Sequence, residues 1–370
     1  MHFDLTDDQK ALRGVLVSMF EKRFGAAQGV EAVAKTALDR ELWTAISELG
    51  LAGILVGEEH GGLAMDLLTL SVVAEVLGSF AVPAPVVANA LAAWTISTSG
   101  SGAVREKWLD RLLAGEAIAA FALSEAVGSM PGQWTVTATA GTGRKTGVER
   151  AAEADLFIVG MAGGGLGIVE AGAPGVAVET FEPLDRTRPV ADVTLSCATV
   201  EPLTADGKFV RKLIDAMLIT LAADGLGAAF AIQSRAIDYA KERKQYGQLI
   251  GSFQALKHQL ADMSVELEPA RPLYWYAAHA WDTDRPDAHR VAAVVKAHVG
   301  ELSVNVCRAA IEAFGGIGYT WEYPGHLFLK RAMAGRTMLG APAAHRERAA
   351  QLAGWSEVND DAKNAVASAA

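Results

Sequence analysis

The chain has 370 residues, 51% of them hydrophobic and 21% charged, which is the balance of an ordinary globular protein. Its formal net charge of −10 disfavours nucleic-acid binding, because such binding needs a basic surface to neutralise phosphates. No apolar run is long enough to predict a membrane span, and the polar, acidic start does not resemble a signal peptide. The two cysteines, Cys197 and Cys307, are far apart, and the eight histidines form no metal-binding pattern. We therefore expect a cytoplasmic protein with neither a metal site nor a membrane segment.

Residues 1–115 are predicted to form a helical domain. Leu12, Leu16, Met19 and Phe20 recur at helical spacing, and further apolar residues do so later in the region. Glycine-rich breaks separate these segments.

Residues 116–205 are predicted to form a β domain. Short alternating segments at 134–139, 156–159 and 175–180 are divided by clusters of Gly, Pro and Asp, which is typical of strands joined by tight turns. The glycine-rich run at 160–165 is not followed by a helix of a βαβ unit, so we do not expect a nicotinamide site there.

Residues 206–354 return to long helical patterns, with helices predicted over 258–280 and 290–314. Helices of this length usually pack in an antiparallel bundle. The Ala- and Asn-rich tail at 355–370 is expected to fray. The whole pattern predicts an α+β fold, but it does not distinguish two unrelated domains from a helical scaffold with a β insertion.

Four motifs resemble those of the acyl-CoA dehydrogenase flavoenzymes and follow in the same order. They are EEHGGL at 58–63, ALSEAVGS at 122–129, RKQYGQLIGSFQ at 243–254 and EAFGGIGYT at 312–320. The resemblance covers about residues 4–354. It implies the fold of that family, with a helical N-terminal domain, a β-barrel-like middle domain and a four-helix-bundle C-terminal domain, and it implies FAD as the cofactor.

In that family FAD lies between subunits, and the C-terminal domain of one subunit holds the ADP part. The residues carried over to that role are Arg243, Tyr246, Phe253, Gln254, Gly315, Gly316 and Gly318. An arginine offers a forked cation to a pyrophosphate, a glutamine can donate and accept hydrogen bonds, and glycines allow the backbone close to a nucleotide. Taken singly, the arginine could equally be a helix-end charge and the glycines simple turns. The fixed order of the motifs favours the nucleotide.

The half of the site that would hold the flavin ring departs from the family pattern. Ser124 and Ser129 are kept, but Met130 replaces an aspartate. Gly147 stands where the family has a tryptophan that covers the flavin, and Glu149 stands near a Thr or Ser position. A carboxylate there would be repelled by a reduced, anionic flavin. The alternative is a local shift of the loop that misaligns the comparison.

The catalytic base of the family is also missing. The reaction removes an α-proton and passes a β-hydride to the flavin, so a carboxylate must lie over the α-carbon. Counting on from the glycines at 315 and 316 places Leu339 at the usual Glu position, and a shift by one residue gives Met338 or Gly340. Some members carry the Glu on the helix before the RxxFG motif, where this chain has Met217.

Two aspartates on that helix are substitute candidates, although neither stands at the base position. Asp215 lies two residues before Met217, about 200° round the helix axis. Asp224 lies two turns further on.

Three functions remain open. The preferred interpretation is a base-lacking subunit of a hetero-oligomeric dehydrogenase, resembling the α2β2 assemblies of actinobacterial sterol degradation. Its partners would be a homologous catalytic subunit, an acyl-CoA substrate and an electron-transfer flavoprotein. The alternatives are a self-sufficient homo-oligomeric flavoenzyme with an atypical base, and a binding or structural module without enzymatic activity. The identity of the acyl chain is not readable from these residues.

Overall fold

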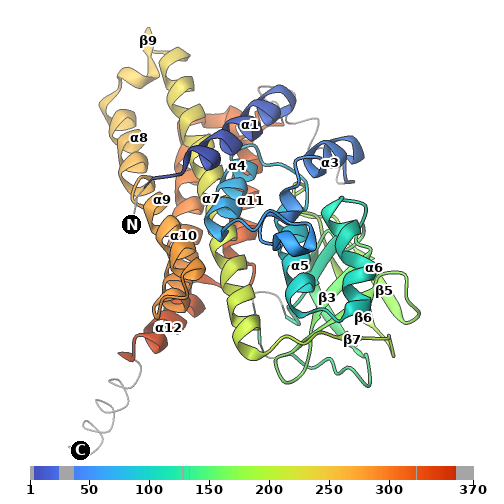
Figure 1. Ribbon diagram of the computed structural model, residues 1–370. Helices are drawn as coiled ribbons and strands as arrows, with labels where there is room; N and C mark the ends of the chain where they lie inside the picture. Colours follow the sequence, from blue (N-terminus) through green and yellow to red (C-terminus); the bar gives the residue numbers. More distant parts are fainter. Residues whose placement is uncertain (1–3, 25–36, 127–128, 133, 322, 356–370) are drawn as a thin grey trace, which may run out of the picture.

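The computed structural model describes residues 4–24, 37–126, 129–132, 134–321 and 323–355. The predicted order of a helical, a β and a second helical region is confirmed. In Figure 1 the strands of the middle region lie at the lower right, and helices of the C-terminal region stand on the left, with α4 and α7 between them. The boundaries predicted at 115/116 and 205/206 fall between elements. The tail predicted to fray lies outside the described residues.

The N-terminal region consists of helices and short 3-10 turns. These are α1 (Asp7–Phe24), α3 (Arg40–Ser47), η1 (Leu51–Gly53), η2 (Glu58–His60), α4 (Leu67–Ser79), α5 (Val86–Ser99) and α6 (Gly102–Leu113). Four of these helices start after a side chain that accepts a hydrogen bond from the backbone amide three residues further on, as N-caps do. The capping residues are Thr6, Asp39, Asp66 and Ser101.

The middle region folds as two sheets. Its strands are β1 (Ala119–Ala122), β2 (Gly143–Glu149), β3 (Leu156–Gly160), β4 (Leu166–Glu170), β5 (Val176–Thr180), β6 (Val190–Leu195) and β7 (Glu201–Pro202). One sheet has the order β1-β3-β4-β7 and the other β2-β6-β5. Only β1 and β3 run parallel. Apolar side chains from both sheets, among them Val148, Phe157 and Val193, share one core.

The strand predicted at 134–139 is not formed. Trp134 and Val136 are buried, which explains the alternating pattern. However, the Thr135 amide and hydroxyl donate to the carboxylate of Glu125, at 2.9 and 2.8 Å, instead of joining a sheet. Alternation in this segment reflects one-sided burial without strand pairing.

The C-terminal region is built on a bundle of four helices. Its elements are α7 (Gly207–Glu242), β8 (Lys244–Gln245), β9 (Gln248–Leu249), η3 (Ile250–Ser252), α8 (Gln254–Leu267), α9 (Ala270–Asp282), α10 (Ala288–Phe314), η4 (Gly315–Tyr319), α11 (Gly325–Thr337) and α12 (Pro342–Leu352). The helix predicted over 290–314 is confirmed. The one predicted over 258–280 is divided into α8 and α9 at Pro269, which has no N–H to continue the helical hydrogen bonds.

Helix α7 joins the two helical regions by crossing α4 at very short range. A Cβ atom on Gly78 would lie 1.9 Å from the carbonyl oxygen of Asp224, and one on Gly227 would lie 1.9 Å from that of Glu75. Only glycine allows this approach. By length and composition α7 could also cross a membrane, but 83% of its most apolar window is buried inside the protein, as in the core helix of a bundle.

Candidate functional site

A cavity of about 700 Å³ lies where the three regions meet. One wall is helical and mostly apolar, with Leu77 from α4, Leu91 from α5 and Leu221 from α7. Residues of the middle region, Phe121 among them, also line it. The volume lies within the range of pockets that take small organic ligands. The three regions therefore together line a partly open pocket that no single region could form.

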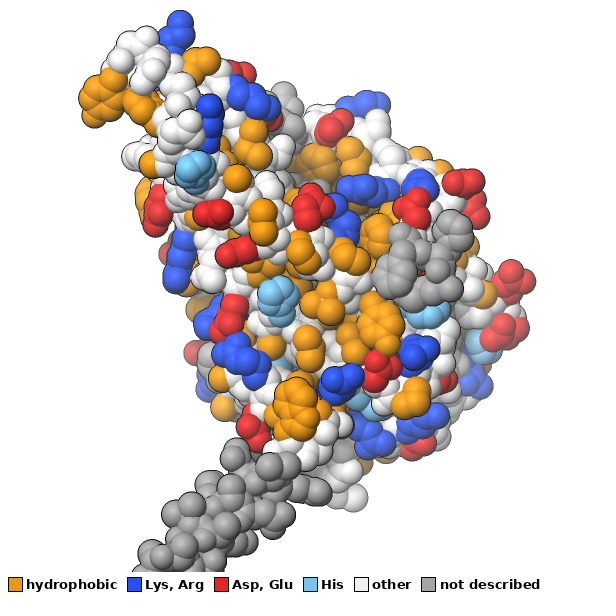
Figure 2. Space-filling view, turned by 90° about the vertical axis from the view of Figure 1, so that its left-hand side faces the viewer, with side chains coloured by type: hydrophobic (Ala, Val, Ile, Leu, Met, Phe, Trp, Pro, Cys, Tyr) orange, Lys and Arg blue, Asp and Glu red, His pale blue; other side chains and the backbone are white. Residues whose placement is uncertain are grey.

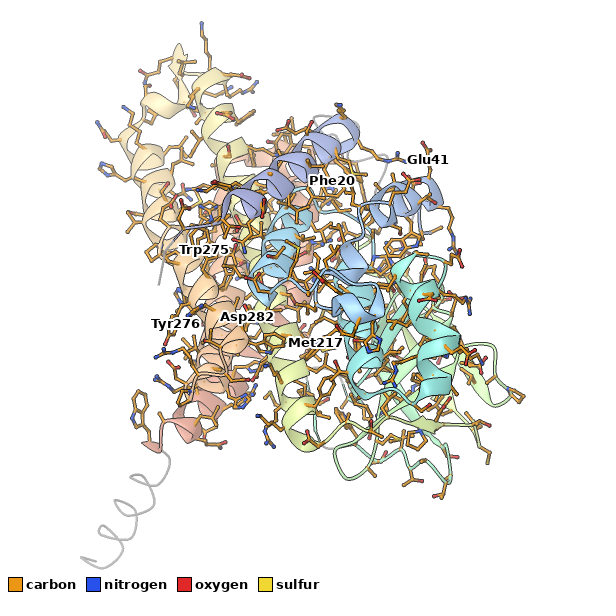
Figure 3. The ribbon with its side chains drawn as sticks, viewed as in Figure 1. Phe20, Glu41, Met217, Trp275, Tyr276 and Asp282 are labelled. Atoms are coloured by element: carbon orange, nitrogen blue, oxygen red, sulfur yellow. The ribbon has the colours of Figure 1, made fainter. Side chains whose placement is uncertain are left out.

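Both predicted base positions line this cavity. Met217 belongs to α7, and Figure 3 shows it near the centre of the molecule. Leu339 follows α11 and has a left-handed backbone, with φ 56°. Met338 also lines the cavity, whereas Gly340 is not among the described lining residues. The fold therefore brings the two predicted base positions, which are distant in the chain, into one cavity. Neither side chain can accept a proton.

Asp224 lines the same cavity but is held by two arginines. Arg331 donates to its carboxylate through Nε at 2.9 Å and Nη2 at 2.6 Å. Arg188 forms a second ion pair with it. Burial would raise the pKa of Asp224, but the charges of Arg188 and Arg331 outweigh it and hold the pKa below the ordinary value. A carboxylate bound in this way is a poor proton acceptor.

Asp215 lies outside the cavity. Its side chain is buried and accepts a hydrogen bond from Arg348 at 2.7 Å, and it also pairs with His289. These partners belong to α12 and α10, on the opposite side of α7 from Met217. The helical geometry that argued against Asp215 as a base agrees with its position.

The middle-region wall contains several residues of the expected ring site. Ser124, Gly147 and Glu149 line the cavity, and Ser129 does not. Gly147 lies in a bulge of β2 with φ 62°, and no atom lies within 4 Å of where its Cβ would be. The position predicted to correspond to the family tryptophan is therefore open space.

The loop that carries Ser129 packs against the turn after α11. A Cβ on Gly340 would lie 2.4 Å from the sulfur of Met130. The two segments that depart from the family pattern, at the flavin loop and at the base, are thus packed against each other.

Carboxylates outnumber cations among the described residues that line the cavity. The carboxylates are Glu149, Glu182, Asp185, Asp192 and Asp224, and the cations are Arg188, Lys330 and Arg331. The cavity is therefore a poor environment for a ring that becomes anionic on reduction.

The predicted ADP residues lie at the far end of the bundle. Arg243 caps the C-terminus of α7, and its carbonyl accepts a hydrogen bond from Ile250 at 2.8 Å. The β8–β9 hairpin turns at Tyr246 and Gly247, both with positive φ, and protrudes at the top of the molecule (Figures 1 and 2). Tyr246 is 93% exposed. Its outward position leaves the ring free to contact a nucleotide or a second subunit.

Phe253 and Gln254 lie beside that hairpin at the start of α8. The rings of Phe253 and Tyr246 meet edge to face, with centroids 6.3 Å apart. The amide of Gln254 is exposed to solvent. The hairpin and the first turn of α8 therefore present aromatic and amide groups together.

The glycine motif lies at the same end of the bundle. The ring of Tyr239, four residues before Arg243, contacts that of Phe314 at 5.4 Å. Gly315 follows with φ 68° and ψ −146°, a conformation that glycine alone adopts readily. No atom lies within 4 Å of a Cβ on Gly315 or Gly316, so their backbone is open. Gly318 instead packs inward against Phe314 and Ile311. The donor set and the open backbone fit the ADP part of FAD.

No sequence pattern predicted the arginines that bind Asp224. Arg188 belongs to the loop between β5 and β6, and Arg331 to α11. Arg331 also donates to Thr187 at 2.8 Å and to the carbonyl of Val82 at 3.2 Å, so one side chain joins all three regions. Charged residues in loops usually face the solvent, so the sequence alone does not show that Arg188 is buried.

Two family models match the chain. One is described as the N-terminal domain of acyl-CoA dehydrogenase and matches residues 6–116, and the other as its C-terminal domain and matches residues 208–353. Benzylmalonyl-CoA dehydrogenase of Aromatoleum aromaticum is 30% identical, over 89% of this chain and 93% of its own length. Acyl-CoA dehydrogenase IpdE2 of Mycobacterium tuberculosis is 29% identical, over 91% of this chain and 94% of its own. Among solved structures, the Tcur3481-Tcur3483 steroid ACAD has a TM-score of 0.86 and 28% identity, over 95% of this chain and 99% of the matched chain.

Proposed function

Because the chain belongs to the acyl-CoA dehydrogenase family of FAD-dependent oxidoreductases, we propose that it is the subunit that lends the ADP-holding half of a flavin site to a catalytic partner. The observation that carries this proposal is the lack of a usable base on the helical wall of its own cavity. In the described part of the chain, that wall presents Leu339 and Met217 at the two base positions, and Asp224 bound to two arginines. A proton on carbon is removed only by an acceptor within reach of it.

The other wall does not replace the base. Glu149 belongs to the middle region, beside Gly147 and Ser124, on the side where the flavin ring would lie. A base must face the substrate from the side opposite the hydride acceptor. Glu149 therefore lies on the wrong side of the cavity for that role.

The residues retained at the far end of the bundle fit the ADP part of FAD. Arg243 would pair with the pyrophosphate through its planar, permanently charged guanidinium. Gln254 would donate and accept hydrogen bonds, and Gly315 and Gly316 would let the backbone approach the nucleotide. When bound, FAD accepts the hydride that leaves the β-carbon of a CoA thioester. In this proposal the residues of this chain orient the cofactor, and the partner subunit supplies the base and the ring pocket.

The assembly we propose is an α2β2 heterotetramer with an electron-transfer flavoprotein as electron acceptor. The similar steroid ACAD is named for two proteins, Tcur3481 and Tcur3483, which supports an enzyme built from a pair of subunits. That relative also makes a steroid acyl-CoA a candidate substrate, beside fatty acyl and branched acyl-CoA esters. The free cysteines Cys197 and Cys307 agree with a cytoplasmic location.

The test is expression of the chain alone and together with a dehydrogenase-like partner from the same source. We expect flavin absorbance and acyl-CoA-dependent dye reduction only in the copurified pair. A lone chain that holds flavin and oxidises an acyl-CoA would instead support a self-sufficient enzyme. No flavin in any combination would support a binding or structural module.

A further inference from the structure

Glu149 and Arg188 line the same cavity and carry opposite charges. Glu149 is the last residue of β2, where it pairs with Val190 of β6. Its neighbour Val148 is buried in the core between the two sheets, and because successive side chains of a strand point to opposite faces, Glu149 points away from that core. Arg188 lies in the loop between β5 and β6 and is 7% exposed. The lining of a mostly apolar cavity therefore includes a buried cation and a carboxylate.

These two groups attract each other without forming a direct bond. Burial would lower the pKa of Arg188, but nearby carboxylates outweigh it and raise the pKa above its ordinary value. These carboxylates are Asp224, Glu149 and Asp185. Among the described residues, Arg188 forms an ion pair with Asp224 alone, and no hydrogen bond joins it to Glu149. Its Nη1 contacts the sulfur of Met338, a weak acceptor, at 4.0 Å. A gap therefore separates a guanidinium that has unused donors from a carboxylate that has unused acceptors.

Arg150 also attracts Glu149, but it brings no donor into the cavity. Its Nη2 donates to the carbonyl of Pro83 at 2.7 Å and to that of Thr187 at 3.3 Å. Its Nη1 donates to Glu153 at 3.2 Å. Arg150 is not among the described residues that line the cavity. It therefore offsets the charge of Glu149 without supplying a hydrogen bond to its oxygens.

The other charged residues of the described cavity lining have partners of their own. The pairs are Asp224 with Arg331, Asp192 with Arg144, Glu182 with Arg186, Asp185 with Thr187 through one oxygen, and Lys330 with the ring of Trp321. Arg188 and Glu149 differ from these, because their charges attract each other across a gap that a group of a ligand can fill.

A group that fits this gap must both accept and donate a hydrogen bond. A hydroxyl does so, since it can accept from the guanidinium and donate to the carboxylate at once. A carboxylate on a ligand would be repelled by Glu149, and an ammonium group cannot accept from Arg188. The rest of the ligand must be apolar, because side chains such as those of Leu77, Leu91 and Phe121 line the same cavity.

We propose that the cavity of this chain binds a ligand with an apolar body and an alcohol group, whose hydroxyl accepts a hydrogen bond from Arg188 and donates one to Glu149. The inference goes beyond the proposed function and rests on it in one respect, since a cavity without a base can hold such a ligand without oxidising it.

The experiment measures how three ligands built on one decyl chain displace the fluorescent dye Nile red. Decan-1-ol both donates and accepts, decyl methyl ether only accepts, and decanoate is anionic. In the wild type we expect decan-1-ol to bind at least about tenfold more tightly than the other two, because it alone satisfies both residues. Glu149→Gln keeps the shape of the side chain and removes its charge, so decanoate should gain at least about tenfold in affinity.

Glu179→Gln is the matched control, because Glu179 is an exposed carboxylate of the same sheet that lies outside the cavity. Its ligand ranking should equal that of the wild type. The titrations use the full chain alone and the copurified pair. Because each substitution is confined to this chain, a difference from the wild type reports on this cavity in either form.

Equal affinities for the alcohol and the ether in the wild type would overturn the proposal. A ligand ranking that stays unchanged in a folded Glu149→Gln chain would overturn it as well. The readout requires neither flavin nor turnover. Failure of the wild type to pair with any dehydrogenase subunit would therefore refute the proposed function, while the titrations still decide what the cavity binds.

Discussion

Asp224→Asn should destabilise the protein strongly, because it removes a carboxylate that binds two buried arginines, Arg188 and Arg331. The Asp224 residue is 5% exposed, and the side chains of Arg188 and Arg331 are 7% and 4% exposed. Arg331 would keep its bonds to Thr187 and Val82. Arg188 would keep a contact with the sulfur of Met338 at 4.0 Å and the electrostatic attraction of Glu149 and Asp185.

Removing one partner of a buried ion pair costs about 3–5 kcal/mol. We expect the lower part of this range, because Asp224 and Arg188 both line the cavity, where water can solvate the freed charge. At about 2–4 °C per kcal/mol, a loss near 3 kcal/mol should lower the melting temperature by roughly 6–12 °C. The folded pKa of Asp224 lies below its ordinary value of 3.8, so its contribution is present above that value and is lost as the pH falls through the folded pKa. The difference between wild type and variant should therefore persist from pH 8 to pH 5.

The assay is thermal melting together with urea denaturation. Asp238→Asn is the control on the same helix, where an exposed aspartate pairs with Lys241 on the surface, and it should change stability by no more than about 0.5 kcal/mol. Equal melting temperatures for the two variants would refute the reasoning, because the buried cluster would then contribute no more than a surface pair.

Three further predictions concern the cofactor, the base and the pH. In the copurified complex, Arg243→Lys should weaken flavin binding at least about tenfold, since a lysine cannot form the forked contact, whereas Lys241→Ala should leave flavin affinity unchanged in a fluorescence titration. Leu339→Glu should not give the lone chain acyl-CoA-dependent dye reduction, because a base alone does not repair the ring half of the site, and measurable turnover would contradict this. Burial raises the pKa of Asp282 on α9 to about 7 (Figure 3), so stability should be lost as the pH rises from about 4 to about 7. Asp282→Asn should reduce this loss by on the order of 1–3 kcal/mol, measured as urea midpoints at pH 5 and pH 8, and an equal loss in both proteins would contradict the assignment.

Much of the fold was predictable because its signals are local. The helix over 290–314 follows from apolar periodicity, and α10 covers Ala288–Phe314. The same periodicity failed at 258–280, where Pro269 interrupts the backbone hydrogen bonds without interrupting the apolar pattern. It also failed at 134–139, because alternate burial resembles strand pairing but does not require it. An apolar pattern indicates which side chains are buried. The hydrogen-bond partners of the backbone depend on other parts of the chain.

The candidate site also has one part that the sequence predicted and one part that only the fold decided. The sequence placed Leu339 and Met217 at base positions, and the fold brings both into one cavity although 121 residues lie between them. It left Asp224 open as a base. The fold decided that question, since Arg331 lies 107 residues away and binds the carboxylate directly.

By itself, the sequence determined the family and the order of the three regions, and it predicted the residues for the ADP part of FAD and the loss of the base. These depend on residue types and their spacing along the chain. The tertiary structure alone decided which charges meet and that the cavity exists. Such features arise where α7, α11 and the β5–β6 loop converge, and contacts between segments so distant in the chain leave no periodic trace in the sequence.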